Sequence, residues 1–144
     1  MLIEVKHPCV QAALTRLRDR ETAAKEFREQ VGTITGLLAF EALRNLEVEE
    51  VVVRTPLAEC GGWRIRSEVV VVPILRAGLG MLESILRLVP DARVGFIGLE
   101  RNEITAEPRE YYCKLPVDIE QREVFLTDPM LATGGTADAA IGFL

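Results

Sequence analysis

Hydrophobic residues recur with a helical period in the first third of the chain and gather into short unbroken runs after it. Residues 8–18 predict a short first helix, and Thr22 is placed to act as the N-cap of a second helix. From there to about Asn45, apolar residues return every three or four positions, which predicts a long helix with one apolar face. The members of this apolar stripe are Phe27, Val31, Ile34, Leu38 and Ala42.

Three short apolar runs predict the strands of a sheet. Residues 69–74 are almost continuously apolar, which is typical of a strand buried on both faces of a parallel sheet. Residues 94–99 and 124–127 have the same character. Between the first two runs, apolar residues in 81–89 are spaced as in a helix that ends before Pro90. A strand, a helix and a strand with short connections predict a right-handed crossover and an α/β fold with a parallel sheet.

Two further segments predict hairpins. Residues 51–53 are strand-like, residues 60–63 with their adjacent glycines predict a turn, and residues 63–66 predict a returning strand. Residues 101–116 lie between two buried strands, are rich in charge and contain prolines. We therefore expect this last segment to extend beyond the sheet as a lid-like hairpin.

Composition indicates one domain, residues 1–144, with 49% hydrophobic residues to form a core. The net charge of −5 argues against a nucleic-acid partner, which would require a basic surface. No apolar run reaches the length of a membrane span and the N-terminus lacks the layout of a signal peptide, so we expect no membrane association and a cytoplasmic protein. The cysteines are far apart and the chain has a single histidine, so we expect no protein-built metal site and interpret the cysteines as buried or half-buried thiols.

The segment with the most chemical information runs from residue 124 to residue 136. It predicts a buried strand, an acidic residue at the end of that strand (Asp128), a small-residue loop and the start of a helix. Backbone N–H groups of the loop, residues 132–136, and the positive end of the helix dipole can bind a phosphate. Thr133 and Thr136 add hydroxyl groups, and Thr136 is also placed to cap the helix. Because α/β sheets bind ligands where their strands end, the pattern predicts a site for a phosphorylated sugar.

The residues of this loop alone allow two other interpretations. A connector without a ligand is the simpler interpretation of a bare Thr-Gly-Gly-Thr sequence. A nucleoside triphosphate site is disfavoured, because no lysine follows the glycines as it does in a P-loop. The longer string Asp128-Pro-Met-Leu-Ala-Thr-Gly-Gly135 is more specific. It resembles the phosphoribosyl diphosphate (PRPP) binding loop of uracil phosphoribosyltransferases, in which Pro-Met follows the acidic residue.

Other segments carry the same resemblance in the same order. Residues 70–80 (Val-Val-Val-Pro-Ile-Leu-Arg-Ala-Gly-Leu-Gly) resemble the family's pyrophosphate loop. Residues 92–103 and 107–116 resemble its flexible hairpin over the active site, and the N-terminal helices resemble its helical arm. The resemblance implies a parallel-sheet type I phosphoribosyltransferase (Rossmann-like) core with a helical arm and a β-hairpin lid. It also implies a pyrimidine salvage reaction, in which uracil and PRPP give UMP and diphosphate.

The resemblance assigns roles to the candidate site residues. Asp128 is expected to hold the ribose hydroxyls, and Arg76 and Arg101 are expected to contact the pyrophosphate, which a planar guanidinium suits. We count these three residues as catalytic. Mg²⁺ is expected as cofactor, held mainly by substrate and water rather than by the protein. The rest of the PRPP-binding set is Pro129, Met130, Leu131, Ala132, Thr133, Gly134, Gly135 and Thr136, with the 5′-phosphate on the last five.

The three catalytic assignments have alternatives. Arg76 could be a surface arginine on a turn, and Arg101 a solvated charge in a loop. Asp128 could serve only to form the turn through Pro129. The resemblance implies in addition a homodimer or higher homo-oligomer and GTP as a candidate effector. The apolar residues that offer an interface are Leu37, Leu38 and Phe40.

The sequence departs from the family pattern in the hairpin and at its end. Glu100 stands beside Arg101 where the family has an aromatic residue, and Ile104 replaces a polar residue. Family members continue into further strands and a hood, whose segment of the Gly-Leu-Gly-Asp-Ala-Gly-Asp type contacts uracil. We therefore expect a chain that is incomplete at its C-terminus. A remnant that binds PRPP without turnover is one alternative function. A pyrimidine-operon RNA-binding regulator is another, disfavoured by the acidic charge.

Overall fold

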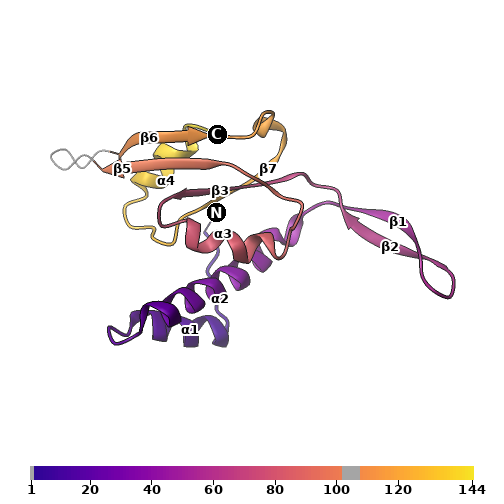
Figure 1. The fold of residues 1–144 in the computed structure, drawn as a ribbon, viewed down its shortest axis with the longest axis horizontal. Coiled ribbons are helices and arrows are strands. Elements are labelled where there is room, and N and C mark those ends of the chain that lie inside the picture. The colour runs from indigo at the N-terminus through magenta and orange to yellow at the C-terminus, as the bar shows by residue number, and fades with distance from the viewer. Residues whose placement is uncertain (1, 102–107) are drawn as a thin grey trace.

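The structure of the chain is a computed structural model that describes residues 2–101 and 108–144. A sheet forms its centre, helices lie on both faces of this sheet, and a separate two-stranded arm projects from it (Figure 1). In chain order the elements are α1 (Pro8–Arg18), α2 (Ala24–Ala42), the short helix η1 (Leu43–Asn45), β1 (Val48–Arg54), β2 (Glu59–Ile65), β3 (Val69–Leu75), α3 (Leu79–Leu86), β4 (Arg93–Val94), β5 (Phe96–Arg101), β6 (Pro108–Lys114), the short helix η2 (Ile119–Gln121), β7 (Glu123–Thr127) and α4 (Gly135–Ile141).

The start of α2 differs from the sequence prediction. Its N-cap is Ala23, whose side chain makes no capping hydrogen bond. The Thr22 hydroxyl donates instead to the Arg16 carbonyl at 2.6 Å. The predicted Thr22 cap was therefore wrong, because that hydroxyl binds the last turn of α1.

The buried face of α2 also differs from the predicted stripe. The fully buried residues of this helix are Thr35 and Ala39. Phe27 and Leu38 keep 46% and 37% of their surface exposed. Gly32 lies against α3, so the two helices approach through small residues of α2 and leave its larger side chains outside.

β3 is the central strand of the five-stranded sheet, and it confirms the buried parallel strand predicted at residues 69–74. It pairs in parallel with β7 along one edge and with β4 and β5 along the other. The strand predicted at residues 94–99 is divided at Gly95, whose N–H donates to the Val71 carbonyl at 3.0 Å. β5 and β6 form the antiparallel hairpin that the sequence predicted.

The alternation of side chains along β3 divides the core into two clusters. One cluster joins alternate residues of β3 to α2 and α3, and the other joins the remaining residues to β5 and α4. The sheet is therefore covered on both faces, as a parallel sheet requires. The buried members are Ala39, Val69, Val71, Ile85 and Val89 in the first cluster and Val70, Val72, Ile74, Ile97 and Ala140 in the second.

β1 and β2 form the projecting arm (Figure 1). Val51 lies opposite Gly62 in the register, so both glycines are inside a strand and the turn predicted at residues 60–63 was wrong. The chain instead reverses between Thr55 and Ala58. The backbone N–H of Thr55 donates there to the Ala58 carbonyl at 2.9 Å. The arm meets the body only through its base (Figure 1).

The cysteines are exposed and free, which corrects the prediction of buried thiols. Cys9 lies in the first turn of α1, Cys60 on the arm and Cys113 on the edge strand β6. β6 and the strand of the arm that carries Cys60 are exposed along almost their whole length, so neither strand buries its cysteine. In the described parts of the chain, no helix is both long enough and apolar enough to cross a membrane.

Candidate functional site

Two parallel strands end side by side at the carboxyl edge of the sheet. Pro73 lies opposite Thr127 in the register, so β7 ends beside Pro73 and β3 ends two residues later, at Leu75. Arg76 directly follows β3, and Asp128 directly follows β7. The sheet thus brings both residues to the edge at which α/β folds bind ligands.

β5 brings a third candidate to this edge from the other side of β3. Leu75 pairs with Gly98, and β5 continues from there to Arg101. The Arg101 Nη2 atom donates a long hydrogen bond of 3.5 Å to the Thr136 hydroxyl oxygen. The guanidinium of Arg101 therefore lies over the loop that follows β7.

The loop after β7 turns into α4 through a left-handed glycine. Gly134 has φ of 82°, a conformation that glycine adopts without steric cost. It is the N-cap of α4, which has no side-chain cap. Thr136 was expected to cap this helix and instead is inside it, because the turn at Gly134 starts the helix earlier. The Thr133 hydroxyl oxygen accepts the N–H of Gly135 at 3.4 Å.

Asp128 has a local structural role. Its Oδ1 atom accepts the N–H of Met130 at 3.1 Å, which shapes the turn after β7. The turn-forming role left open by the sequence is therefore present. It is compatible with ligand binding, because a carboxylate has two oxygens and several acceptor positions.

A cavity of about 210 Å³ lies where these segments meet, and we call it the loop cavity. Seven of the expected site residues line it, together with Ala137, which the sequence did not single out. The expected residues that do not line the loop cavity are Arg76, Pro129, Thr133 and Gly135. The lining consists of Arg101, Asp128, Met130, Leu131, Ala132, Gly134, Thr136 and Ala137.

The loop after β3 packs directly against the end of β7. Arg76 is exposed, and the peptide bond between Leu75 and Arg76 is cis. Gly78 is buried, and a Cβ atom there would lie 2.5 Å from the Thr127 carbonyl oxygen. This glycine therefore permits the loop after β3 to lie against the end of β7. In the sequence, Gly78 belongs to residues 70–80, which resemble the pyrophosphate loop, and its position two residues after Arg76 was the available signal for this close packing.

Comparison with known proteins identifies the family. A family model described as uracil phosphoribosyltransferase matches residues 4–144. The chain belongs to the uracil phosphoribosyltransferase family. A uracil phosphoribosyltransferase of Wolinella succinogenes is 51% identical over 144 residues, which are 99% of this chain and 69% of that relative. A uracil phosphoribosyltransferase of Dictyoglomus turgidum is 52% identical over 145 residues, 100% of this chain and 70% of the relative.

Two solved structures share the fold of this chain. The AQ2163 protein of Aquifex aeolicus is similar to this chain with a TM-score of 0.92 and 40% identity, over 99% of this chain and 68% of the other. A hypoxanthine-guanine phosphoribosyltransferase of Bacillus anthracis has a TM-score of 0.56 and 18% identity, over 80% of this chain and 57% of the other. The second likeness concerns the fold alone. The predicted α/β phosphoribosyltransferase fold is confirmed.

Two residues in the hairpin, Glu100 and Ile104, differ from the pattern of the uracil phosphoribosyltransferase family, and the structure describes one of them. Glu100 lies opposite Arg109 in the register of β5 and β6, so it has a positively charged neighbour across the strands. Ile104 lies outside the described residues.

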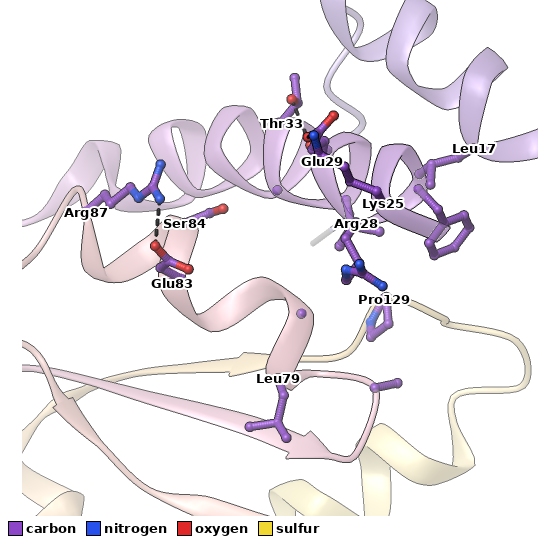
Figure 2. Close-up of a pocket in the computed structure, with 15 residues that line it drawn as sticks. Leu17, Lys25, Arg28, Glu29, Thr33, Leu79, Glu83, Ser84, Arg87 and Pro129 are labelled. Atoms are coloured by element: carbon purple, nitrogen blue, oxygen red, sulfur yellow. Dashed lines mark hydrogen bonds and ion pairs between the residues drawn. The ribbon is translucent and has the colours of Figure 1, made fainter. Parts of the chain in front are cut away.

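A second cavity, of about 1100 Å³, lies between α2 and α3 (Figure 2). Figure 2 shows Arg28 extending from α2 toward Pro129, the residue after Asp128. On α3, Arg87 Nη2 donates to Glu83 Oε1 at 2.6 Å (Figure 2). This groove and the loop cavity therefore border the same short segment from opposite sides.

Proposed function

We propose that this chain transfers the phosphoribosyl group of PRPP to uracil, giving UMP and diphosphate. The observation that supports this best is the convergence of Arg101, Asp128 and the loop 132–136 on one cavity. Relatives named uracil phosphoribosyltransferase at 51% and 52% identity favour turnover over a remnant that only binds PRPP. The same family membership disfavours an RNA-binding regulator.

Each site residue has a distinct part in the proposed mechanism. The loop 132–136 binds the 5′-phosphate through backbone N–H groups and threonine hydroxyls. Asp128 accepts hydrogen bonds from the ribose hydroxyls. The bond between the anomeric carbon and the pyrophosphate oxygen breaks, N1 of uracil bonds to that carbon, and the N1 proton is released. Negative charge grows on the leaving pyrophosphate, and the guanidinium groups of Arg76 and Arg101 stabilise it.

The protein groups fit a magnesium ion that is carried mainly by the substrate. Among the described residues, no group of three or more His, Cys, Asp or Glu side chains is placed to hold a metal. Within residues 2–101 and 108–144, Asp128 is the single carboxylate that lines the loop cavity, and it would share the ion with substrate oxygens and water. When bound, Mg²⁺ would neutralise part of the pyrophosphate charge.

The substitution Asp128→Asn tests this site. An asparagine side chain still has an oxygen to accept the Met130 N–H, so the turn is kept while the negative charge is lost. Hydrogen bonds to charged groups contribute about 1.5–3 kcal/mol, so we expect PRPP affinity to fall by roughly ten- to a hundredfold in calorimetric titration with Mg²⁺. UMP formation from uracil should fall as well.

Asp138→Asn is the matched control. It makes the same change of charge on the exposed side of α4, close to the loop but outside the lining of the loop cavity. We expect PRPP affinity close to that of the unaltered chain. If the unaltered chain fails to bind PRPP, or if the two variants behave alike, the proposed role of Asp128 is wrong.

We propose that GTP, the candidate effector, binds the groove between α2 and α3. Lys25, Arg28 and Arg87 line this groove, whose volume of about 1100 Å³ is large enough for a nucleotide. A ligand there would touch Pro129 and so act on the turn formed by Asp128. Arg28→Gln should weaken GTP binding in calorimetric titration and leave PRPP binding unchanged in the absence of GTP. Equal GTP affinity in the variant would contradict this placement.

We also propose that the chain forms a homodimer or a higher homo-oligomer. Phe40 and Leu38, which the sequence offered as interface residues, keep 67% and 37% of their surface exposed. Phe40 also lines an apolar groove of about 430 Å³ with Val48 and Leu88, where α2 meets the base of the arm. Apolar surface of this extent favours burial in an assembly.

A further inference from the structure

Three arginines gather at the amino edge of the sheet, opposite the loop cavity. Arg93 begins β4, and Arg122 directly precedes β7. β4 and β7 pair with opposite edges of β3 at its first residues, with Val70 facing Arg93 and Val69 facing Glu123. The sheet therefore holds these two arginines on either side of the start of β3.

The third arginine, Arg66, arrives on the segment that joins the arm to β3. Together these residues line a cleft of about 320 Å³, which we call the amino-edge cleft. β3 has seven residues, and at about 3.3 Å per residue its two ends lie roughly 20 Å apart. The amino-edge cleft is thus a separate place from the proposed PRPP site.

The ion pair of Arg122 leaves one buried hydrogen-bond donor of its side chain without an acceptor in the described part of the chain. Its side chain is only 9% exposed, and its Nη1 atom pairs with the carboxylate of Glu68. Its Nε atom is buried and has no hydrogen-bond partner among the described residues. A guanidinium has five N–H donors, and a buried donor without an acceptor costs free energy.

The charges of the amino-edge cleft favour an anion. Its lining contains Arg66, Arg93 and Arg122 against the carboxylates of Glu68 and Asp91, an excess of one positive charge in a chain of net charge −5. Of the three guanidiniums, Arg66 has a further partner in Glu47, which lies outside the lining, at 3.8 Å, and both side chains are largely exposed. Phosphate oxygens match the planar donor array of arginine.

We propose that the amino-edge cleft binds a small phosphomonoester through the guanidinium groups of Arg66, Arg93 and Arg122. The cleft has more room than a phosphate group alone occupies, which is why we assign it a phosphate carried on a small organic group rather than a free phosphate ion. The site is independent of PRPP binding and turnover.

Crystals of the chain soaked in selenate, a phosphate mimic with anomalous scattering, test this site directly. We expect an anomalous peak in the amino-edge cleft in addition to any peak at the loop 132–136. In solution, calorimetric titration with glycerol 3-phosphate and with inorganic phosphate, each repeated with saturating PRPP and Mg²⁺, should show a site that PRPP does not block. Glycerol 3-phosphate should bind more tightly than inorganic phosphate.

Arg122→Lys sharpens the test, because lysine keeps the charge and the pairing with Glu68 but lacks the planar donor array of a guanidinium. We expect glycerol 3-phosphate affinity at the cleft to fall about tenfold, the loss of one charge-assisted hydrogen bond. Arg64→Lys makes the same change on the arm, where Arg64 pairs with Glu49, and should bind as the unaltered chain does. If Arg122→Lys fails to fold, Arg93→Gln replaces it with the same expectation.

Two results would overturn the proposal. One is selenate density only at the loop 132–136, or none at all. The other is a cleft signal that Arg122→Lys and Arg93→Gln leave unchanged, which would mean an adventitious ion only. Because density and affinity are measured without turnover, failure of the proposed enzymatic function would leave these readouts intact.

Discussion

Gly78 shows how little space separates the loop after β3 from the end of β7. A Cβ atom at this position would lie 2.5 Å from the Thr127 carbonyl oxygen and 2.7 Å from the Ile74 nitrogen. Both obstacles are backbone atoms of the sheet, so the loop rather than the sheet must move. We expect Gly78→Ala to destabilise the chain by about 1–3 kcal/mol in urea unfolding, the range for overpacking, and to weaken PRPP binding.

Gly36→Ala is the control for this change. Gly36 lies inside α2, and a Cβ atom there meets nothing within 4 Å. Alanine should stabilise the chain by roughly 0.5–1 kcal/mol, because it reduces the freedom of the unfolded backbone. If the two alanine variants had equal stability, the close packing at Gly78 would not constrain the loop.

Cys113 gives a prediction about pH. Burial raises the pKa of the Cys113 thiol, and the negative charge of Glu110 raises this pKa further. A raised pKa lowers the thiolate fraction near neutral pH, so alkylation should be slower than in the same chain unfolded in urea. With Cys9 and Cys60 changed to serine, Glu110→Gln should lower the pKa and speed alkylation by iodoacetamide. Burial is the larger cause, so the rate should stay below that of the unfolded chain.

For single residues, the sequence predicted a local structure best where that structure favours one residue type. A left-handed turn before a helix calls for glycine, and Gly134 occupies it. Thr22 and Thr136 were placed wrongly as caps, because a threonine hydroxyl can bind whichever backbone group tertiary structure brings near it. The exposure of the cysteines was also missed, since it depends on which face of each element the fold covers.

Among the elements, the β5–β6 hairpin is built around a second crowded glycine. A Cβ atom at Gly98 would lie 2.7 Å from ring atoms of Tyr111, next to a register shift between Gly98 and Leu99. The obstacle here is the outer part of a side chain that is 49% exposed, which can swing away. We expect Gly98→Ala to cost roughly 1 kcal/mol or less, below the cost of Gly78→Ala, in the same urea unfolding series.

Gly61→Ala on the arm serves as the strand control, because its Cβ atom would meet nothing within 4 Å. The hairpin also carries Arg101 over the phosphate loop, so Gly98→Ala should reduce PRPP affinity while Gly61→Ala should not. A Gly98→Ala variant less stable than Gly78→Ala would show that the Tyr111 ring is held more firmly than its exposure suggests.

Element boundaries were predictable where burial is complete. Residues 69–74 read as a buried strand, and all of them are buried. The arm was harder, because the glycines at positions 61 and 62 are a turn signal by composition and yet lie in a strand. Neither face of the arm packs on the body, so local turn chemistry at Thr55 decides its register. The stripe on α2 failed for a related reason, since surface that a partner would cover resembles core in a sequence.

The whole molecule exposes more apolar surface on the arm than a monomer requires. Trp63 is 68% exposed, Val52 76% and Leu57 96%. An isolated two-stranded hairpin is marginally stable in water, so the arm is expected to be covered by a second copy of the chain. Trp63 is the single tryptophan, and its fluorescence emission should move to shorter wavelength as protein concentration rises.

Val52→Glu should oppose this association by placing a charge on the covered surface. We expect sedimentation velocity to show a shift toward the monomer, with the Trp63 emission staying at long wavelength. Glu50→Gln, on the same strand, is a control that adds no charge. An emission maximum independent of concentration, together with a monomeric chain, would contradict the proposed assembly.

The order of the strands in the sheet could not be predicted from the sequence. Hydrophobic runs identified the three buried strands, but β3 lies between β5 and β7 because of crossovers that pair residues far apart in the chain. The site could still be anticipated, since loops after neighbouring parallel strands share one edge whatever their order. The amino-edge cleft could not be anticipated, because Arg66, Arg93 and Arg122 have no common pattern in the sequence.

The central position of β3 determines the order in which parts of the molecule should unfold. This strand is the most protected part of the chain, it carries one substrate loop at its end, and it holds the other through β7. Its amide hydrogens should therefore exchange with solvent only when the entire domain unfolds, whereas those of the arm should exchange through local fraying at concentrations where the chain is monomeric. PRPP at a hundred times its Kd should slow exchange in β3 by the equivalent of about 2.7 kcal/mol and leave the arm untouched. On heating, the arm should come apart first and the substrate site last.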